Sequence, residues 1–206
     1  MGVKERKALE KQMRRNQILD AARHVLFSSG IDSISMSRIA EQAELGVGTI
    51  YFYYKNKEEI FVALQEEGLS LLYDMICTIV EEDIPHDEKL VRIAMCYYRF
   101  SLEQKNYFDI INYFLSSPRI FFEPDLKTRI DMSGRKILAA IRDIVSKGVS
   151  KGIFAEKYPE KFSVMFWAAL HGLIHFRKLE KTTLENESIE QFYEYSVHKL
   201  ISSIRQ

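Results

Sequence analysis

The chain has 206 residues, of which 47% are hydrophobic and 28% are charged, a composition that excludes a disordered or fibrous protein. Its 29 basic and 29 acidic side chains give a formal net charge of zero, so any affinity for nucleic acid must be local. The charge is indeed uneven, because residues 1–23 contain seven basic and three acidic side chains, a local net charge of +4.

The N-terminal part of the chain predicts two helices. The first covers about residues 7–29, where Ile18 and Leu26 belong to a set of apolar residues at helical spacing, and Gly30 then supplies a left-handed stop. Ser35 is a natural N-cap for a short second helix, which carries three small or apolar residues on one side: Ile39, Ala40 and Ala43.

A third helix is predicted for residues 47–54, after a turn at residues 44–46. Ile50 and Tyr54 lie four residues apart and share its inward face. Two short helices joined by a tight turn form a unit whose second helix can enter the major groove of DNA. Residues 35–54 therefore predict a helix-turn-helix.

The middle of the chain predicts further helices and no strands. Asn56 should cap a fourth helix that runs to about Glu82, and Glu59 completes an N-x-x-E capping box. A polar loop containing proline is predicted at residues 82–87, and more helices on both sides of Pro118.

The C-terminal part predicts three helices. The first follows an irregular aromatic segment at residues 121–124 and should end near Gly148 or Gly152, and Pro159 suits the first turn of the second. The last helix is expected at about residues 188–204. We therefore expect an all-α protein, with a three-helix helix-turn-helix head joined to a helical ligand-binding and dimerisation body.

The most apolar stretch of the chain is residues 162–176. A serine and two histidines interrupt it, and it is shorter than the roughly 18 to 20 residues that cross a bilayer. A helix that is apolar almost all round is instead buried between other helices or in an interface. We expect no membrane association and a cytoplasmic protein.

A longer set of residues is more specific than the helical pattern: Ile18-Leu19-Asp20-Ala21-Ala22, Leu26-Phe27, Gly30, Ile39-Ala40, Gly48-Thr49-Ile50-Tyr51-Phe52-Tyr53-Tyr54 and Lys57-Glu58. Over residues 15–64 this set resembles the N-terminal domain of the TetR family of transcriptional regulators. The resemblance implies a DNA-binding domain, placed at residues 1–55, and an effector-binding and dimerisation domain at residues 56–206. The body itself matches only loosely, at residues 152–154 and 170–173.

The turn of the helix-turn-helix departs from the family pattern. Members usually carry glycine where this chain has Glu44, and a non-glycine residue with positive φ costs about 1 kcal/mol. We expect Gly46, two residues later, to absorb part of this geometry.

Geometry and the resemblance together indicate the side chains that face double-stranded DNA: Ser35, Ser37, Arg38, Val47, Gly48, Thr49, Tyr51, Phe52, Tyr53, Lys55 and Lys57. Hydroxyl groups there suit phosphate oxygens, and Val47 or Phe52 suits a thymine methyl group. Lys57 begins the fourth helix, where free N–H groups favour a phosphate. The alternatives are that the tyrosines pack the head and that the lysines are merely solvated.

The resemblance also implies a homodimer through the last two helices and a small apolar or aromatic effector whose binding releases a palindromic operator, as in a repressor. The aromatic and polar residues proposed to contact it are Tyr97, Arg99, Phe100, Tyr113, Phe114, Phe166, Trp167 and His171. In the alternative interpretation these residues fill the core, and the protein is a constitutive DNA-binding or protein-interaction factor.

Catalytic and metal-binding motifs are weak in this sequence. His171 and His175 have the i, i+4 spacing of a metal-binding pair, but H-E-x-x-H, a glycine-rich loop and a nucleophile elbow are missing. Cys77 and Cys96 lack zinc spacing and suit small core positions, with redox sensing as the alternative. We expect no enzyme activity, no cofactor and no bound metal.

Overall fold

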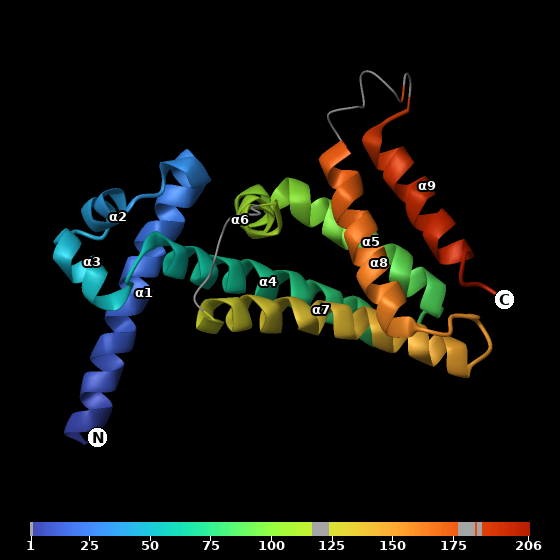
Figure 1. The fold of residues 1–206 in the computed structure, drawn as a ribbon, viewed down its shortest axis with the longest axis horizontal. Coiled ribbons are helices and arrows are strands. Elements are labelled where there is room, and N and C mark those ends of the chain that lie inside the picture. Colours follow the sequence, from blue (N-terminus) through green and yellow to red (C-terminus); the bar gives the residue numbers. More distant parts are fainter. Residues whose placement is uncertain (1, 117–123, 177–183, 185–186) are drawn as a thin grey trace. The chain divides into compact units, whose positions relative to one another are not determined.

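The computed structural model describes residues 2–116, 124–176, 184 and 187–206, and over these residues the chain is helical and forms no strands (Figure 1). One isolated antiparallel bridge joins Phe154 and Arg205. The expected all-α fold is confirmed. No helix in these ranges is long and apolar enough to span a membrane.

The chain divides into two compact units. The head unit comprises Met1–Leu69 and Lys105–Ile130, and the body unit comprises Ser70–Gln104 and Asp131–Gln206. Each unit therefore draws on two separate stretches of sequence.

The head unit begins with α1 (Val3–Ser29), against which α2 and α3 lie (Figure 1). Its other elements are the 3₁₀ turn η1 (Ile31–Ser33), α2 (Met36–Gln42), α3 (Val47–Tyr53), the first turns of α4 (Lys57–Glu81), α6 (Lys105–Ser116) and the first turns of α7 (Pro124–Ser150). Helix α1 starts four residues earlier than predicted, because the Glu5 carboxylate accepts a hydrogen bond from the backbone N–H of Gly2 at 2.7 Å and so caps an earlier first turn.

The core of the head unit is formed by the apolar faces that the sequence pattern predicts. Ile18 and Leu26 of α1, Ile39 of α2 and Ile50 of α3 are fully buried. Ile110 of α6 joins the same cluster, although it is more than 40 residues away along the chain. The small head thus gains apolar surface from the middle of the sequence, which makes its core larger than three short helices can provide.

The body unit contains the second half of α4, α5 (His86–Glu103), most of α7, α8 (Pro159–His175) and α9 (Ile189–Ser202). Helices α5, α8 and α9 contact one another, and α8 and α9 run side by side in Figure 1. Pro159 occupies the first turn of α8 as predicted, and Ser188 caps α9 by accepting a hydrogen bond from the N–H of Gln191. Pro118 and residues 121–123 lie outside the described residues.

Helix α8 is not enclosed on all sides within the body unit. Phe162, Phe166 and Leu170 are buried, but Val164 and Met165 are 51% and 47% exposed. The strong apolar character of this helix therefore exceeds what the unit itself covers. Of the two free cysteine thiols, Cys96 is buried as predicted and Cys77 is half-buried.

Candidate nucleic-acid interface

Helix α2 begins where the sequence predicts because Ser35 caps it. The Ser35 Oγ accepts a hydrogen bond from the backbone N–H of Arg38 at 3.2 Å, which satisfies one of the free donors of the first turn. Ala40 is 2% exposed on the inner face, and its carbonyl oxygen accepts a hydrogen bond from the N–H of Leu45 at 2.9 Å. The small Ala40 side chain lets the turn fold closely onto α2.

The turn places its strain on one residue. Glu44 has φ of 55°, and among the described residues it is the one non-glycine residue with positive φ. Gly46 does not absorb this geometry, because it has φ of −67° and ψ of 143° as the extended N-cap of α3. The expectation for Gly46 is therefore wrong. Glu44 itself bears a cost of about 1 kcal/mol.

Helix α3 has a buried and an exposed side. Ile50 is 0% exposed, and Tyr54, the residue that directly follows the helix, is 2% exposed, as the spacing predicts. On the outer side, Tyr51 is 53% exposed and Phe52 is 76% exposed. Two large aromatic side chains on the surface of a well-packed short helix are unusual in a protein that binds nothing there.

The structure distributes the predicted DNA-facing residues between surface and interior. The exposed ones are Ser37, Arg38, Val47, Gly48, Tyr51, Phe52, Lys55 and Lys57. Ser35, Thr49 and Tyr53 are half-buried. The Tyr53 ring packs edge-to-face on Phe52 with centroids 5.1 Å apart, and it also packs against the head core. Tyr53 thus has a packing role besides any role at the surface.

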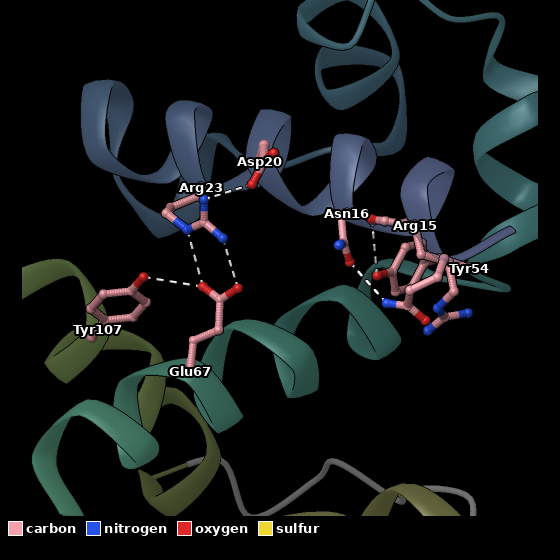
Figure 2. A network of polar contacts seen from close by, with 8 residues as sticks. Arg15, Asn16, Asp20, Arg23, Tyr54, Glu67 and Tyr107 are labelled. Carbon is pink, nitrogen blue, oxygen red and sulfur yellow. Dashed lines mark hydrogen bonds and ion pairs between the residues drawn. The ribbon is translucent and has the colours of Figure 1, made fainter. Parts of the chain in front are cut away.

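Arg15 of α1 fixes the end of α3, as Figure 2 shows in part. Its guanidinium donates a hydrogen bond to the carbonyl oxygen of Tyr53 at 2.6 Å and lies 4.2 Å from the centre of the Tyr54 ring. Burial raises the pKa of the Tyr54 phenol. Gln17 adds a hydrogen bond to the carbonyl oxygen of Ala43 at 3.0 Å. Both contacts hold the helix-turn-helix against α1.

Sequence reasoning did not assign Arg15 or Gln17 to this positioning role. Their partners lie 38 and 26 residues further along the chain. No local motif connects residues so far apart.

Helix α4 begins four residues after the end of α3, and its N-terminal cap differs in detail from the prediction. The Asn56 Oδ1 accepts a hydrogen bond from the N–H of Glu59 at 2.9 Å, as expected. The Glu59 carboxylate, however, accepts from the N–H of Lys55 rather than from that of Asn56. Lys57, at the first position of α4, is exposed, and its Nζ lies 5.8 Å from the centre of the Phe61 ring. The helix start thus combines free N–H groups with a cation.

Charged residues join the other helices of the head unit. Arg23 of α1 pairs with Glu67 of α4, and the Tyr107 hydroxyl of α6 donates to the same carboxylate at 3.1 Å (Figure 2). Arg129, near the start of α7, forms a two-pronged ion pair with Glu66 of α4. Four helices are therefore connected by polar contacts around the packed core.

The residues proposed to contact an effector do not all gather in one place. Tyr97, Phe100 and Phe166 are fully buried in the body unit, Trp167 and His171 are half-buried, and Arg99 is exposed. Tyr113 belongs to the head unit, where its ring packs on Phe61 with centroids 5.1 Å apart. Nothing is described for the Phe114 side chain.

Three of these residues form a contact cluster between α5 and α8. The Tyr97 ring lies 4.3 Å from that of Trp167, and its hydroxyl is 2.7 Å from the Nδ1 of His171. Burial raises the pKa of Tyr97, and burial together with the nearby His175 lowers the pKa of His171 to about 4. Near neutral pH the cluster is therefore aromatic, polar and uncharged.

Residues 18–64 match the model of the family described as "Bacterial regulatory proteins, tetR family". Residues 90–200, more than half of the chain, match the model described as "Tetracyclin repressor-like, C-terminal domain". The chain belongs to the TetR family of regulators. It is therefore a DNA-binding transcriptional regulator, and the exposed side of α3 belongs to its helix-turn-helix.

Individual relatives agree with this assignment. The fatty acid metabolism regulator protein of Bacillus subtilis (strain 168) is 26% identical over 147 residues, which cover 71% of this chain and 74% of that protein. The solved structure of FadR from Bacillus subtilis with stearoyl-CoA has a TM-score of 0.70 at 22% identity, covering 92% and 98% of the two chains. AibR with isovaleryl coenzyme A and operator DNA has a TM-score of 0.66 at 18% identity, covering 91% and 98%. These relatives are transcriptional regulators rather than enzymes.

Proposed function

We propose that this TetR-family regulator is a dimeric repressor that binds a palindromic operator and releases it when a small-molecule effector with an apolar or aromatic part binds. The observation that carries the DNA-binding part is the two-sided character of α3. Ile50 anchors the helix in the core while Tyr51 and Phe52 remain on the surface. A rigid helix with exposed aromatic groups can enter the major groove without refolding.

Most contacts of this surface with DNA are proposed to be with the sugar-phosphate backbone. Hydroxyl groups and lysines bind phosphate oxygens and thereby position the protein, whereas bases are distinguished by bidentate donors. Arg38 is the one arginine among the proposed contact residues. The exposed Gly48 has no atom within 4 Å of where a Cβ would lie, so the backbone there is open to a close approach.

Dimerisation through α8 and α9 is proposed from their uncovered apolar side chains. Val164 and Met165 of α8 are about half exposed, and Tyr195 of α9 is 56% exposed. A two-fold dimer presents two copies of α3 to half-sites roughly 34 to 36 Å apart. We further propose residues 1–55 as the DNA-binding domain and residues 56–206 as the effector-binding and dimerisation domain.

For the effector we propose an acyl thioester of coenzyme A. Two structural relatives were solved in complex with ligands of this class, FadR with stearoyl-CoA and AibR with isovaleryl coenzyme A. The uncharged cluster of Tyr97, Trp167 and His171 suits the apolar chain and neutral carbonyl of a thioester better than a free carboxylate. Preference of the effector for one dimer geometry would couple its binding to operator release.

The test begins with operator DNA selected from a random pool and measured by fluorescence anisotropy. Binding should weaken steeply with salt, because phosphate contacts release counterions. Replacing Tyr53 and Lys57 by Ala should abolish binding, and long-chain acyl-CoA should release the wild-type protein. Full affinity in the Tyr53 and Lys57 variant would refute the assigned surface. Operator binding that no acyl-CoA alters would leave a constitutive DNA-binding factor.

A further inference from the structure

Two histidines on α8 lie one helical turn apart with their outer ring nitrogens close together. The Nε2 atoms of His171 and His175 are 3.2 Å apart, and the ring centroids are 4.8 Å apart. His171 is half-buried, whereas His175 is exposed. The surrounding residues therefore hold the His171 ring, whereas the His175 ring is open to solvent.

This spacing suits a shared metal ion. Histidine nitrogens bind Zn²⁺ at about 2.0 to 2.1 Å, and two ligands at the tetrahedral angle around one ion are then about 3.4 Å apart. The observed 3.2 Å lies close to that separation, so small side-chain rotations suffice to admit an ion. Imidazole nitrogens bind Zn²⁺, Ni²⁺ and Cu²⁺ well.

Tyr97 supplies the outer support that metal-binding histidines usually have. Its hydroxyl lies 2.7 Å from the Nδ1 of His171, which directs Nε2 toward His175. Tyr97 is fully buried, so the orientation of the His171 ring is set by the core.

We propose that His171 and His175 form a chelating site for a divalent transition-metal ion such as Ni²⁺ or Zn²⁺, which both Nε2 atoms bind. In this proposal His171 carries its proton on Nδ1, beside the Tyr97 oxygen, and in the metal-free protein the Nε2–H of His175 donates to the Nε2 of His171. When the metal binds, the proton of His175 moves to Nδ1, and no net proton is released. The described residues offer no cluster of three metal-binding side chains, so water or a bound ligand would complete the coordination.

The chain contains its own reporter for this site. Trp167 is the single tryptophan, lies four residues before His171 on α8, and contacts the same Tyr97 ring at 4.3 Å. Paramagnetic Ni²⁺ at the histidine pair should quench its fluorescence. We expect saturable quenching of the untagged full-length protein with one ion per chain, reversed by EDTA.

Matched variants separate this site from other histidines. His175→Gln removes one ligand at an exposed position and retains a hydrogen-bonding group, so the fold is preserved. Its affinity for Ni²⁺ should fall about 100-fold, because the second ligand no longer acts at high effective concentration. His198→Gln, on α9 beside Glu194, should leave the affinity unchanged.

A second measurement uses protein stability. Zn²⁺ should raise the Tm of the wild-type protein and of His198→Gln but not that of His175→Gln, because a ligand that binds only the folded chain stabilises it. Equal quenching in the wild-type protein and His175→Gln would overturn the proposal, as would the absence of saturable quenching in the wild-type protein. Neither result would bear on operator binding, so this inference fails independently of the proposed function.

Discussion

Arg23 of α1 and Glu67 of α4 face each other through two parallel hydrogen bonds (Figure 2). The Arg23 Nε lies 3.0 Å from the Glu67 Oε2, and the Arg23 Nη2 lies 2.7 Å from the Glu67 Oε1. Both side chains are about one-third exposed, and the contact with Glu67 raises the pKa of Arg23. This two-pronged geometry is the strongest form of ion pair and fixes the relative rotation of the two helices.

Replacing Arg23 by Ala should destabilise the protein by about 1.5 to 3 kcal/mol, the range for hydrogen bonds to charged groups. The Glu67 carboxylate would retain only its bond from Tyr107. Urea unfolding measures the change. The control is Arg6→Ala, which breaks the exposed pair with Glu10 and should cost less than about 1 kcal/mol. Equal effects of the two substitutions would show that the two-pronged geometry adds nothing to stability.

The features that could be predicted from the sequence are those whose cause is local. The Ser35 and Asn56 caps, the stop at Gly30 and the first turn at Pro159 depend on atoms within four residues of one another. Their chemistry is therefore visible in a short window of sequence.

Contacts between distant residues could not be predicted in the same way. The Arg15 hydrogen bond to Tyr53, the Arg23 pair with Glu67 and the Tyr97 contact with His171 join residues 38, 44 and 74 positions apart. Such pairs depend on how whole helices pack. A single sequence carries the apolar periodicity that drives packing but not the partner that each polar side chain finds.

The left-handed conformation of Glu44 leads to a stability prediction. Glu44→Gly should stabilise the protein by about 0.5 to 1 kcal/mol, because glycine adopts positive φ without a Cβ clash. The matched control is Gly46→Ala at φ of −67°, where a Cβ would meet its nearest atom, the Thr49 Oγ1, at 3.9 Å. Thermal unfolding of both variants measures the change in stability that each substitution causes. A loss of stability in Glu44→Gly would mean that the glutamate side chain contributes more than its backbone costs.

The two sides of α3 should respond differently to truncation. Phe52→Ala removes a side chain that is 76% exposed, so it should weaken operator binding while the free energy of unfolding stays within about 0.5 kcal/mol. Ile50→Ala removes a fully buried side chain and should cost about 2 to 5 kcal/mol. Operator titration and urea unfolding of both variants test this. Unchanged operator affinity in Phe52→Ala would remove that ring from the DNA interface.

The exposed side of α8 provides a test of dimerisation. Val164→Glu places a charge on the proposed interface and should shift the protein toward monomers in sedimentation equilibrium, because an unpaired charge is costly to bury. Leu115→Glu on α6 is the control, since Leu115 is 58% exposed but lies outside α8 and α9. If Val164→Glu remained as dimeric as Leu115→Glu, the interface would have to be sought on another surface.

The pKa of His171 predicts how stability depends on pH. In the folded chain this pKa falls from its ordinary 6.5 to about 4, chiefly through burial and secondly through His175. The unfolded chain therefore binds a proton first as the pH decreases, so the contribution of His171 is intact above pH 6.5 and is lost between pH 6.5 and 4. Other groups titrate in this range too, and a variant isolates the effect of this residue.

His171→Gln retains a hydrogen-bonding partner for Tyr97 but cannot take up the proton. The wild-type protein should therefore lose more stability than His171→Gln when urea unfolding at pH 7.5 is compared with unfolding at pH 5. His198→Gln at an exposed position should follow the wild-type protein. Parallel losses in all three proteins would mean that His171 is readily protonated in the folded state. Burial and the neighbouring His175 would then not be sufficient to keep it neutral.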